Sequence, residues 1–269
     1  MKKITSRDNQ WVKLAVSLKQ KKYRYERHRL LAEGFRLVGD AVDNGVTDGV
    51  CLVTETVAAR PEFDALRIRA ERAGWDVYAV TDSVYEKIRD TRSPQGIAAV
   101  LPFFEYTLDT LPPVRHEQAV LYLEGVQDPG NLGTVIRTAA AANAGAVLLS
   151  TDCVDFYNGK TVRSAMGAVF KVTVVQQVKT ADLLRYCDST GRRLIAAVPG
   201  AETSYTQTDW TRPAVVAFGN EGAGLTADFT ARCGETLTIP MKAGTESLNL
   251  AISVGIVLYK AWECAGFKE

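Results

Sequence analysis

Three glycine-rich segments in the second half of the chain carry polar side chains of the kinds that bind ligands. They are EGVQDPGNLGTVIRTA (124–139), FGNEGAGL (218–225) and IPMKAGTESLNLAISVGIVLYKAWE (239–263). Each lies at the end of a short apolar run without alternation, which is typical of a strand buried on both faces. Because ligands of parallel sheets lie beyond the carboxyl ends of the strands, we expect one polar pocket where the three segments meet.

Each segment by itself also has an ordinary structural explanation. In the first, Asn131 can cap a helix that begins there, which would place Arg137 within two turns of the helix N-terminus, or simply on the surface. In the second, Glu221 can belong to an ordinary glycine-rich turn. In the third, Ser247 and Asn249 would suit the start of any helix. A site is nevertheless indicated, because three such segments are expected at strand ends of one sheet.

The glycine spacing disfavours a phosphate-binding nucleotide site. Gly219, Gly222 and Gly224 form the order GxxGxG, which is not the GxGxxG fingerprint of dinucleotide-binding proteins. No GxxxxGK[ST] segment occurs, and no acidic residue ends the next strand at the spacing that ribose recognition would need. A nucleotide-dependent oxidoreductase on a parallel sheet is therefore a poor interpretation. A glycine-lined loop can instead hold a ligand without phosphates.

Cysteine, histidine and hydropathy patterns limit the class of protein. The five cysteines are widely spaced without a CxxC pair, and there are two histidines, which argues against a disulfide scaffold and a metal centre. The N-terminus lacks the apolar region of a signal peptide, and the longest uncharged run, 138–151, is shorter than the roughly 20 residues of a membrane span. We expect a cytoplasmic protein without bound metal or membrane contact.

Positive charge is concentrated in one short segment. The net charge of the chain is +1, so any nucleic-acid surface must be local. Residues 19–29 (KQKKYRYERHR) hold six Lys or Arg and one Glu, which makes the segment about +5 and the remainder about −4. Cations mixed with tyrosines can pair with phosphates and stack on bases. The alternative is a solvated helix end whose tyrosines pack on the body of the protein.

The periodicity predicts an α/β protein with two domains. Strand and helix patterns alternate up to residue 102, whereas PFFEYTLDTLPPVRHE (102–117) carries three prolines and no clear period. The predicted domains are 1–102 and 118–269, joined by a linker at 103–117. We expect in the first domain strands at 29–32, 49–54, 76–80 and 96–101, with helices at 7–19, 35–43, 62–73 and 83–89.

The second domain is predicted to contain a mostly parallel sheet with helices on both faces. Buried-strand patterns occur at 119–123, 146–149, 172–175, 194–198, 214–218 and 236–239. Helical patterns lie between most of them, and a final amphipathic helix is expected from about 248 to 264.

The three segments, in this order, resemble the three motifs of the SpoU/TrmH family of RNA 2′-O-ribose methyltransferases, in the SPOUT superfamily. The matching residues are Asn131-Leu132-Gly133-Thr134 with Arg137, Gly219-Asn220-Glu221-Gly222, and Ile239-Pro240-Met241 through Ser247-Leu248-Asn249-Leu250-Ala251. The stretch KTVRSAMGAVFKV (160–172) also looks like that family, so the likeness covers about 117–265. LLAEGFRLVGDAV (30–42) is similar to the ribosomal-protein-like substrate-binding domain that often precedes it.

The resemblance implies an enzyme that transfers a methyl group from S-adenosyl-L-methionine to a ribose 2′-hydroxyl of ribosomal RNA or, less favoured, transfer RNA. It also implies a C-terminal trefoil knot and a homodimer, and for the dimer contact we expect Ile252, Ile256 and Tyr259 of the last helix. That apolar face can alternatively pack on its own sheet. With an RNA-binding domain implied, RNA contact becomes the preferred role of the basic segment, with Lys160 and Arg163 as further candidates or an exposed helix face.

Roles for individual residues follow from the family likeness. Arg137 would activate the 2′-hydroxyl or bind the adjacent phosphate, the second role being favoured because a free guanidinium stays protonated below about pH 12. The other predicted catalytic residues are Asn131, Glu221, Ser247 and Asn249. The predicted cofactor-binding residues are Gly219, Gly222, Ile239, Met241, Leu248 and Asn249, and the predicted RNA-binding residues are Lys21, Lys22, Arg24, Arg27, Lys160 and Arg163.

A non-catalytic RNA-binding protein that retains the methyltransferase fold is the main alternative function. The polar residues of all three motifs are intact, which favours the enzyme.

Overall fold

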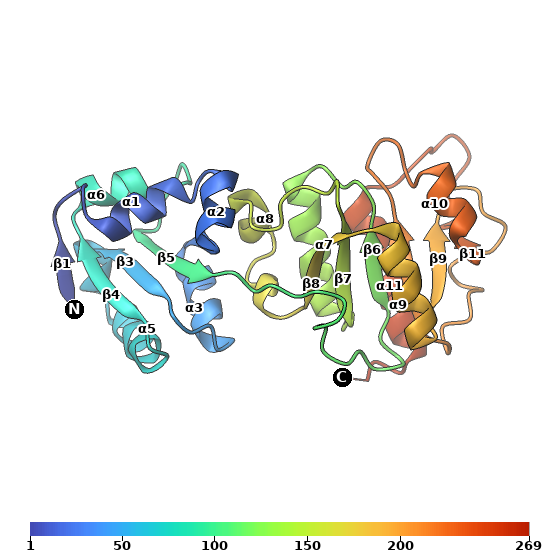
Figure 1. Ribbon diagram of the computed structural model, residues 1–269, viewed down its shortest axis with the longest axis horizontal. Coiled ribbons are helices and arrows are strands. Elements are labelled where there is room, and N and C mark those ends of the chain that lie inside the picture. Colours follow the sequence, from blue (N-terminus) through green and yellow to red (C-terminus); the bar gives the residue numbers. More distant parts are fainter. Residues whose placement is uncertain (269) are drawn as a thin grey trace. The chain divides into compact units, whose positions relative to one another are not determined.

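The computed structural model describes residues 1–268, and its contacts divide the chain into two compact units. The first unit contains Met1–Phe104 together with Tyr157–Phe170, and the second contains Glu105–Phe156 together with the residues from Lys171 onwards. Figure 1 labels the elements of each unit.

The first unit is built on a mixed sheet. Within the described residues its strand order is β1-β4-β3-β5-β2, with β1, β3 and β4 mutually parallel and β5 antiparallel to both β3 and β2. The strands are β1 (Lys2–Ile4), β2 (Arg29–Glu33), β3 (Val50–Thr54), β4 (Asp76–Val80) and β5 (Ile97–Pro102). The helices are α1 (Gln10–Ser17), α2 (Lys21–Arg27), α3 (Phe35–Asp43), α4 (Glu55–Ala58), α5 (Pro61–Arg72), α6 (Asp82–Ile88) and α8 (Gly159–Ser164), with a 3₁₀ turn at Ala168–Phe170.

Three elements within residues 1–102 are not among the helices and strands predicted from the sequence. β1 has three residues, and α4 has four, so neither is long enough to show a hydrophobic period. α2 (KKYRYER) is almost entirely polar and has no apolar stripe, yet it forms, and it is capped at its C-terminus by His28, whose φ of 49° is left-handed.

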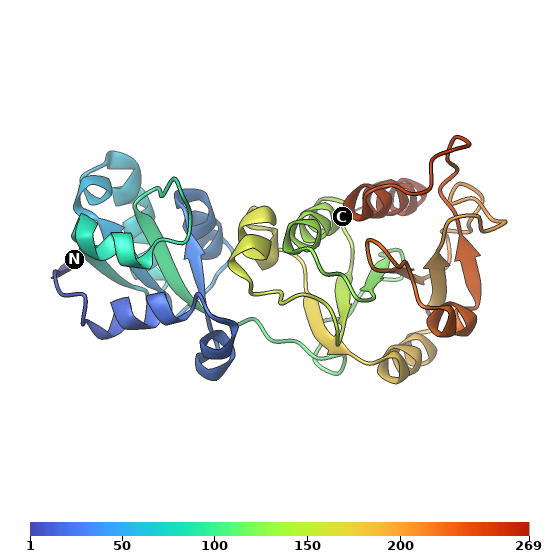
Figure 2. The same cartoon turned by 90° about the horizontal axis from the view of Figure 1, so that it is seen from above.

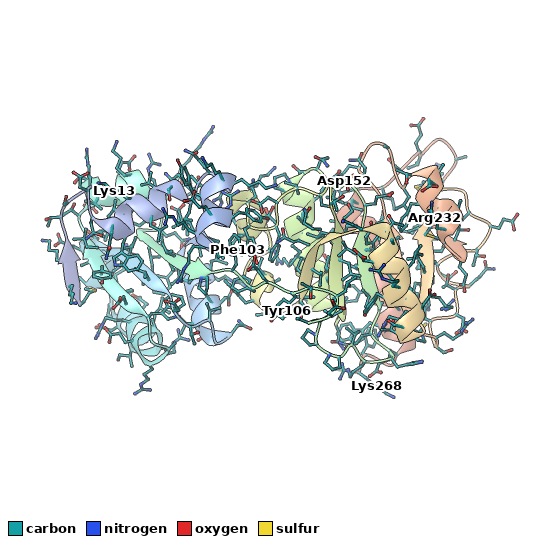
Figure 3. All side chains as sticks on the ribbon, in the orientation of Figure 1. Lys13, Phe103, Tyr106, Asp152, Arg232 and Lys268 are labelled. Carbon is teal, nitrogen blue, oxygen red and sulfur yellow. The ribbon has the colours of Figure 1, made fainter. Side chains whose placement is uncertain are left out.

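Residues 157–170 pack with the first unit although they lie within the predicted second domain. The Tyr157 ring stacks on Phe103 with centroids 3.6 Å apart, and the Tyr157 hydroxyl donates to the backbone oxygen of Phe104 at 2.8 Å. Arg163 pairs with Asp90 at 2.6 Å. Figure 3 labels Phe103 at the end of β5. Aromatic stacking and an ion pair therefore attach this segment, which carries α8, to residues more than fifty positions earlier.

The second unit has the parallel sheet that the sequence predicts. Its order is β11-β9-β10-β6-β7-β8, and every pairing between these described strands is parallel. The strands are β6 (Val120–Leu123), β7 (Ala146–Ser150), β8 (Val174–Val178), β9 (Arg193–Ala197), β10 (Ala214–Phe218) and β11 (Glu235–Leu237). The helices are α7 (Pro129–Ala141), α9 (Thr180–Thr190), α10 (Ala227–Arg232) and α11 (Leu250–Cys264).

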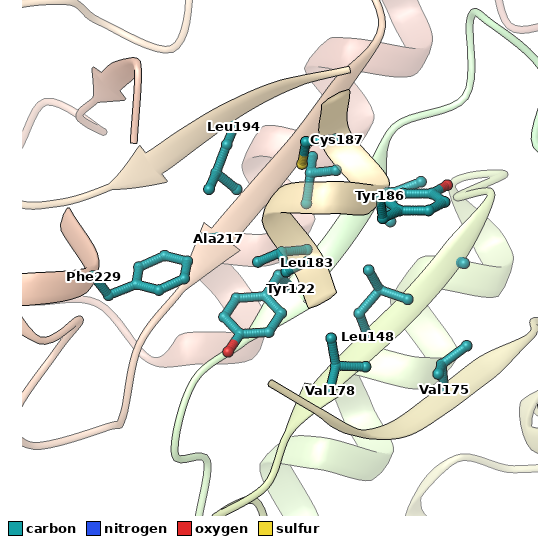
Figure 4. Packing of buried hydrophobic residues seen from close by; sticks show 13 residues of the cluster. Tyr122, Leu148, Val175, Val178, Leu183, Tyr186, Cys187, Leu194, Ala217 and Phe229 are labelled. Atoms are coloured by element: carbon teal, nitrogen blue, oxygen red, sulfur yellow. The ribbon is translucent and has the colours of Figure 1, made fainter. Parts of the chain in front are cut away.

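Helices cover both faces of this sheet, with α7 and α11 on one face and α9 and α10 on the other (Figure 2). The core under α9 and α10 contains Tyr122, whose ring stacks on Phe229 with centroids 5.0 Å apart, and Leu183 of α9 beside Leu148 of β7 (Figure 4). Burial of each large apolar side chain stabilises the fold by roughly 1.5–3 kcal/mol. The central strands are thus fixed, and the loops at their carboxyl ends start from a rigid base.

Candidate active site

A pocket of about 360 Å³ lies in the second unit, beyond the carboxyl ends of β9, β10 and β11. Its volume falls in the range of small-molecule sites. The lining comes from four segments: 197–199, 218–224, 237–241 and 246–253. Most of the lining residues are apolar or glycine, and Thr238, Ser247 and Ser253 are the hydroxyl-bearing residues among the described ones.

The loop after β10 is folded back on itself. Asn220 and Gly224 exchange two backbone hydrogen bonds, of 3.0 and 2.9 Å. A Cβ atom at Gly219 would lie 2.0 Å from the carbonyl carbon of Gly224, so glycine alone fits there. The Asn220 side chain accepts from the backbone N–H of Gly222 at 2.9 Å and donates to the backbone oxygen of Gly125 at 2.8 Å. The loop is therefore closed, and Asn220 attaches it to the segment that follows β6.

Glu221 joins the same two segments through its carboxylate. It accepts from the backbone N–H groups of Gln127 at 3.2 Å and Asp128 at 3.1 Å, and from the Asn131 side-chain amide at 3.1 Å. Partial burial raises the pKa of Glu221, but hydrogen bonds from its own backbone, Asn131, Gln127 and Asp128 outweigh this and leave the pKa below its ordinary value. The ionised carboxylate is thus the form that the site favours.

Asn131 extends this connection to the third segment. Its side-chain oxygen accepts from the Asn249 amide at 3.0 Å, and the Asn249 oxygen caps α11 by accepting from Ala251 N at 2.9 Å. A continuous chain of hydrogen bonds, Glu221–Asn131–Asn249, therefore holds together the segments 124–139, 218–225 and 239–263.

The start of α7 differs from the expectation. The helix begins at Pro129, and Asp128 is its cap, accepting from the backbone N–H of Asn131 at 2.7 Å. Proline is favoured at the first helical position because its missing N–H is not needed there, and a start at Pro129 puts Asp128, a residue well suited to capping, in the cap position. Asn131 is consequently not the cap, and its side chain reaches Glu221 and Asn249 instead.

Arg137 is consequently further from the helix start than expected. It follows Pro129 by eight residues, or about 12 Å along the axis, which is more than two turns. It is exposed, does not line the pocket, and has no hydrogen-bond or ion-pair partner within residues 1–268. A separation of six residues also places Arg137 about 120° around the helix from Asn131. The chain therefore does not bring Arg137 into the Glu221–Asn131–Asn249 group, and its guanidinium faces solvent.

The predicted site residues thus separate into two sets. The pocket is lined by most predicted cofactor-binding residues and two of the predicted catalytic residues, namely Gly219, Gly222, Ile239, Met241, Leu248, Glu221 and Ser247. Asn131, Asn249 and Arg137 lie outside its lining.

Ser150, the last residue of β7, and Asp152, just after it, also support the site and were not identified from the sequence. The Ser150 hydroxyl accepts from Gly125 N at 2.9 Å and donates to the Asp152 carboxylate, and the Gln127 side chain donates to the backbone oxygens of Asp152 at 2.7 Å and Gly125 at 3.1 Å. Asp152 is labelled in Figure 3. Ligands of parallel sheets lie beyond the carboxyl ends of the strands, and β7 is one of these strands. The sequence signal for Ser150 and Asp152 was therefore their position at the end of a predicted strand.

Arg24, predicted to bind RNA, has a structural role instead. It is 5% exposed, and its guanidinium donates to the backbone oxygens of Leu18 at 2.8 Å and Lys19 at 3.0 Å. Carbonyls at a helix end lack intrahelical partners, and a guanidinium satisfies them well. Arg24 thereby fixes the connection from α1 to α2 and is not accessible to a phosphate on the surface.

The other five cations of residues 19–29 fall into two groups, those that bind a backbone oxygen and those that do not. Lys19 donates to the oxygen of Lys87 at the end of α6, and Arg29 donates to the oxygen of Asp48. Lys21, Lys22 and Arg27 are exposed and, within residues 1–268, donate no side-chain hydrogen bond to a backbone oxygen. The ammonium of Lys21 lies 5.6 Å from the ring centroid of Tyr25, and that of Lys22 lies 5.7 Å from the ring centroid of Tyr23.

Of the two candidates on α8, Lys160 is exposed, whereas Arg163 is partly buried in its ion pair with Asp90. Within residues 1–268, no group of three or more His, Cys, Asp or Glu is arranged to hold a metal ion. In the same part of the chain, no helix combines the length and apolar character needed to cross a bilayer.

Comparison with protein families gives two matches. The model of the SpoU rRNA Methylase family matches residues 118–259, and that of the MRM3-like substrate binding domain matches residues 9–99.

Individual proteins are similar over nearly the whole chain. An uncharacterized tRNA/rRNA methyltransferase of Synechocystis is 35% identical, covering 96% of this chain and 92% of that protein. The 23S rRNA (guanosine(2553)-2′-O)-methyltransferase RlmP of Bacillus subtilis is 33% identical, covering 96% and 98%. The crystal structure of an AdoMet-bound rRNA methyltransferase from Sinorhizobium meliloti superposes with a TM-score of 0.86, at 32% identity and 97% coverage of both chains.

Proposed function

The chain belongs to the SpoU rRNA methylase family, and on this basis we propose that it transfers the methyl group of S-adenosylmethionine to a ribose 2′-hydroxyl of ribosomal RNA. The observation that carries the proposal is the Glu221–Asn131–Asn249 chain of hydrogen bonds, which joins the three segments beside a pocket of cofactor size that the second and third of them line.

The pocket fits S-adenosylmethionine in its chemistry. Phe218, Leu237 and Leu250 supply apolar walls that suit an adenine ring, and the loop backbone at Gly219 and Ile239 can hydrogen-bond its edge. A phosphate-bearing cofactor would favour a Lys or Arg in the pocket wall. Within the described residues, no Lys or Arg lines the pocket. Leu248, Gly222 and Met241 complete the proposed cofactor contacts.

The bound cofactor supplies a methyl group already activated by its sulfonium, so electrophilic help from a metal is not needed. The chain must hold the 2′-oxygen in line with that methyl group and assist loss of the hydroxyl proton. In this proposal Glu221, Asn131 and Asn249 fix the loops, and Ser247 lies on the pocket wall. Arg137 binds the phosphate beside the reacting ribose, supported by its exposed, unpaired guanidinium.

The first unit is proposed to bind the RNA. The match of residues 9–99 to a substrate binding domain supports this role, as do the exposed cations on α2 and α8. These are Lys21, Lys22, Arg27 and Lys160. The names of relatives such as RlmP, a 23S rRNA methyltransferase, favour ribosomal over transfer RNA.

We further propose a homodimer that forms through α11. Ile252 is 56% exposed and Tyr259 is 45% exposed, with the half-buried Ile256 between them. Positions separated by four and three residues share one helix face, so these side chains form an apolar stripe open to solvent. The free cysteines support a cytoplasmic location, and the family likeness supports a trefoil knot.

Calorimetric binding of S-adenosylmethionine tests the cofactor assignment. We expect saturable binding. If no binding is detected at about 1 mM cofactor, the binding free energy is weaker than about 4 kcal/mol, and the proposal is contradicted. Mapping of ribose methylation in ribosomal and transfer RNA from a deletion strain and its parent tests the reaction. Loss of one ribosomal RNA methylation is the expected result and identifies the substrate nucleotide.

A further inference from the structure

The charged side chains that line the cofactor pocket are all acidic within residues 1–268. Within the part of the chain that the structure describes, the charged side chains in its lining are two carboxylates, Glu221 and Glu246, and no cation accompanies them. The remaining lining consists of apolar side chains, hydroxyls, an amide and loop backbone. The pocket therefore has a negative potential that its own lining does not neutralise.

The two carboxylates differ in how they are bound. Glu221 accepts from Gln127 N, Asp128 N and Asn131, so three donors already surround its charge. Glu246 is exposed and has no hydrogen-bond or ion-pair partner among residues 1–268. Lys242, the nearest cation in the sequence, neither lines the pocket nor forms an ion pair with Glu246. The unpaired charge at this site is thus that of Glu246.

The cofactor changes its charge during methyl transfer. S-adenosylmethionine carries a sulfonium, an ammonium and a carboxylate, so its net charge is +1. As the methyl carbon forms its bond to the 2′-oxygen, its bond to sulfur breaks and leaves the electron pair on sulfur. The sulfonium thus becomes a neutral thioether, and S-adenosylhomocysteine has no net charge. The proton lost from the hydroxyl goes to solvent. A carboxylate on the pocket wall attracts the substrate form of the cofactor more strongly than the product form.

We propose that Glu246 is a specificity-determining residue that makes the pocket prefer S-adenosylmethionine over S-adenosylhomocysteine and so promotes release of the spent cofactor. This inference rests on the proposed function, because it assumes that the pocket binds this cofactor. Apart from the charge, the two molecules differ by one methyl group, so the apolar walls contact them almost equally. The discrimination therefore arises from the interaction of the charge with Glu246.

The expected size is modest because Glu246 is exposed. Charges a few ångströms apart near a protein surface interact far more weakly than in a dry interior, and solvent and salt screen them further. We expect Glu246 to contribute about threefold to tenfold to the ratio of the two dissociation constants.

The test is titration calorimetry of the full-length protein with S-adenosylmethionine, S-adenosylhomocysteine and sinefungin, which carries an ammonium group in place of the methylsulfonium. In Glu246→Gln, the affinities for S-adenosylmethionine and sinefungin should fall about threefold to tenfold, while that for S-adenosylhomocysteine changes less than about twofold. The difference should shrink at high salt. Glu202→Gln, an exposed glutamate of the same unit outside the pocket lining, is the matched control and should leave the ratio unchanged.

Glu246→Asp provides a second variant that keeps the charge, and it should retain most of the preference. Equal loss of affinity for all three ligands in Glu246→Gln would overturn the inference, because it would indicate a packing role for Glu246. An unchanged ratio of affinities would overturn it as well, and would leave the cofactor assignment intact. Failure of the wild-type protein to bind either cofactor form would instead refute the proposed function, and this inference with it.

Discussion

The strongest structural prediction concerns the carboxylate of Glu221. In Glu221→Gln the side chain keeps its shape, but an NH₂ group replaces one of the two oxygens. Gln127 N donates to one oxygen, while Asp128 N and Asn131 donate to the other. Whichever way the amide turns, at least one of these donors faces another donor and loses its acceptor.

The magnitude follows from these three bonds. A hydrogen bond to a charged acceptor contributes about 1.5–3 kcal/mol, and one to a neutral acceptor about 0.5–1.5 kcal/mol. In the more favourable orientation of the amide one bond is lost and two are weakened, but Glu221 is exposed, so solvent reduces the difference. We expect the closed arrangement of the three loops to lose about 1–2 kcal/mol, which corresponds to about a fivefold to thirtyfold weaker cofactor affinity.

Calorimetry with S-adenosylmethionine and S-adenosylhomocysteine measures this effect, and affinity for both should fall because both require the closed loops. Glu202→Gln again serves as the control. Thermal unfolding should change little, since the hydrophobic core of the sheet is not touched. If Glu221→Gln binds both ligands as tightly as wild type, the hydrogen bonds to Glu221 do not hold the pocket closed, and the reasoning is refuted.

The pKa of Glu221 adds a pH dependence with a definite sign. Because hydrogen bonds lower this pKa in the folded protein, the carboxylate stabilises the closed loops above the ordinary glutamate pKa of about 4.5. That contribution is lost as the pH falls below this value and through the lower folded pKa. Cofactor affinity should therefore decrease in this acidic range in the wild type and show a smaller decrease there in Glu221→Gln.

Three further predictions concern the surface residues. Arg137→Ala should lower methyl transfer by at least about 100-fold while S-adenosylmethionine affinity stays within a few-fold, and turnover near the wild-type rate on the mapped RNA would contradict the role of Arg137. Replacing Lys21, Lys22 and Arg27 by Gln should weaken RNA binding and reduce its salt slope by about three, as measured by filter binding at several salt concentrations, and an unchanged slope would show that these cations do not contact phosphates. Tyr259→Glu should shift the protein towards a monomeric mass in sedimentation, unless α11 has no role in self-association.

Local chemistry made much of the secondary structure predictable. The helix at 35–43 and the strands at 76–80 and 214–218 have the bounds expected from the sequence, because apolar runs, glycines and capping residues act over a few neighbouring positions. α7 shows the limit of this approach. Both Asp128 and Asn131 are good caps, and the start of the helix at Pro129 decided which of them is used.

The tertiary structure alone decided how distant residues combine. The sequence indicated that three strand ends would meet, but not that Asn131 would bind Glu221, 90 residues later, and Asn249, 118 residues later. It also did not separate Arg24, which is buried against helix carbonyls, from Lys21, which is exposed. Periodicity reports which face of an element is apolar, whereas a hydrogen-bond partner depends on where the whole chain places the other group. For that reason the sequence alone determined the types of residue at this site, and the fold decided which of them touch.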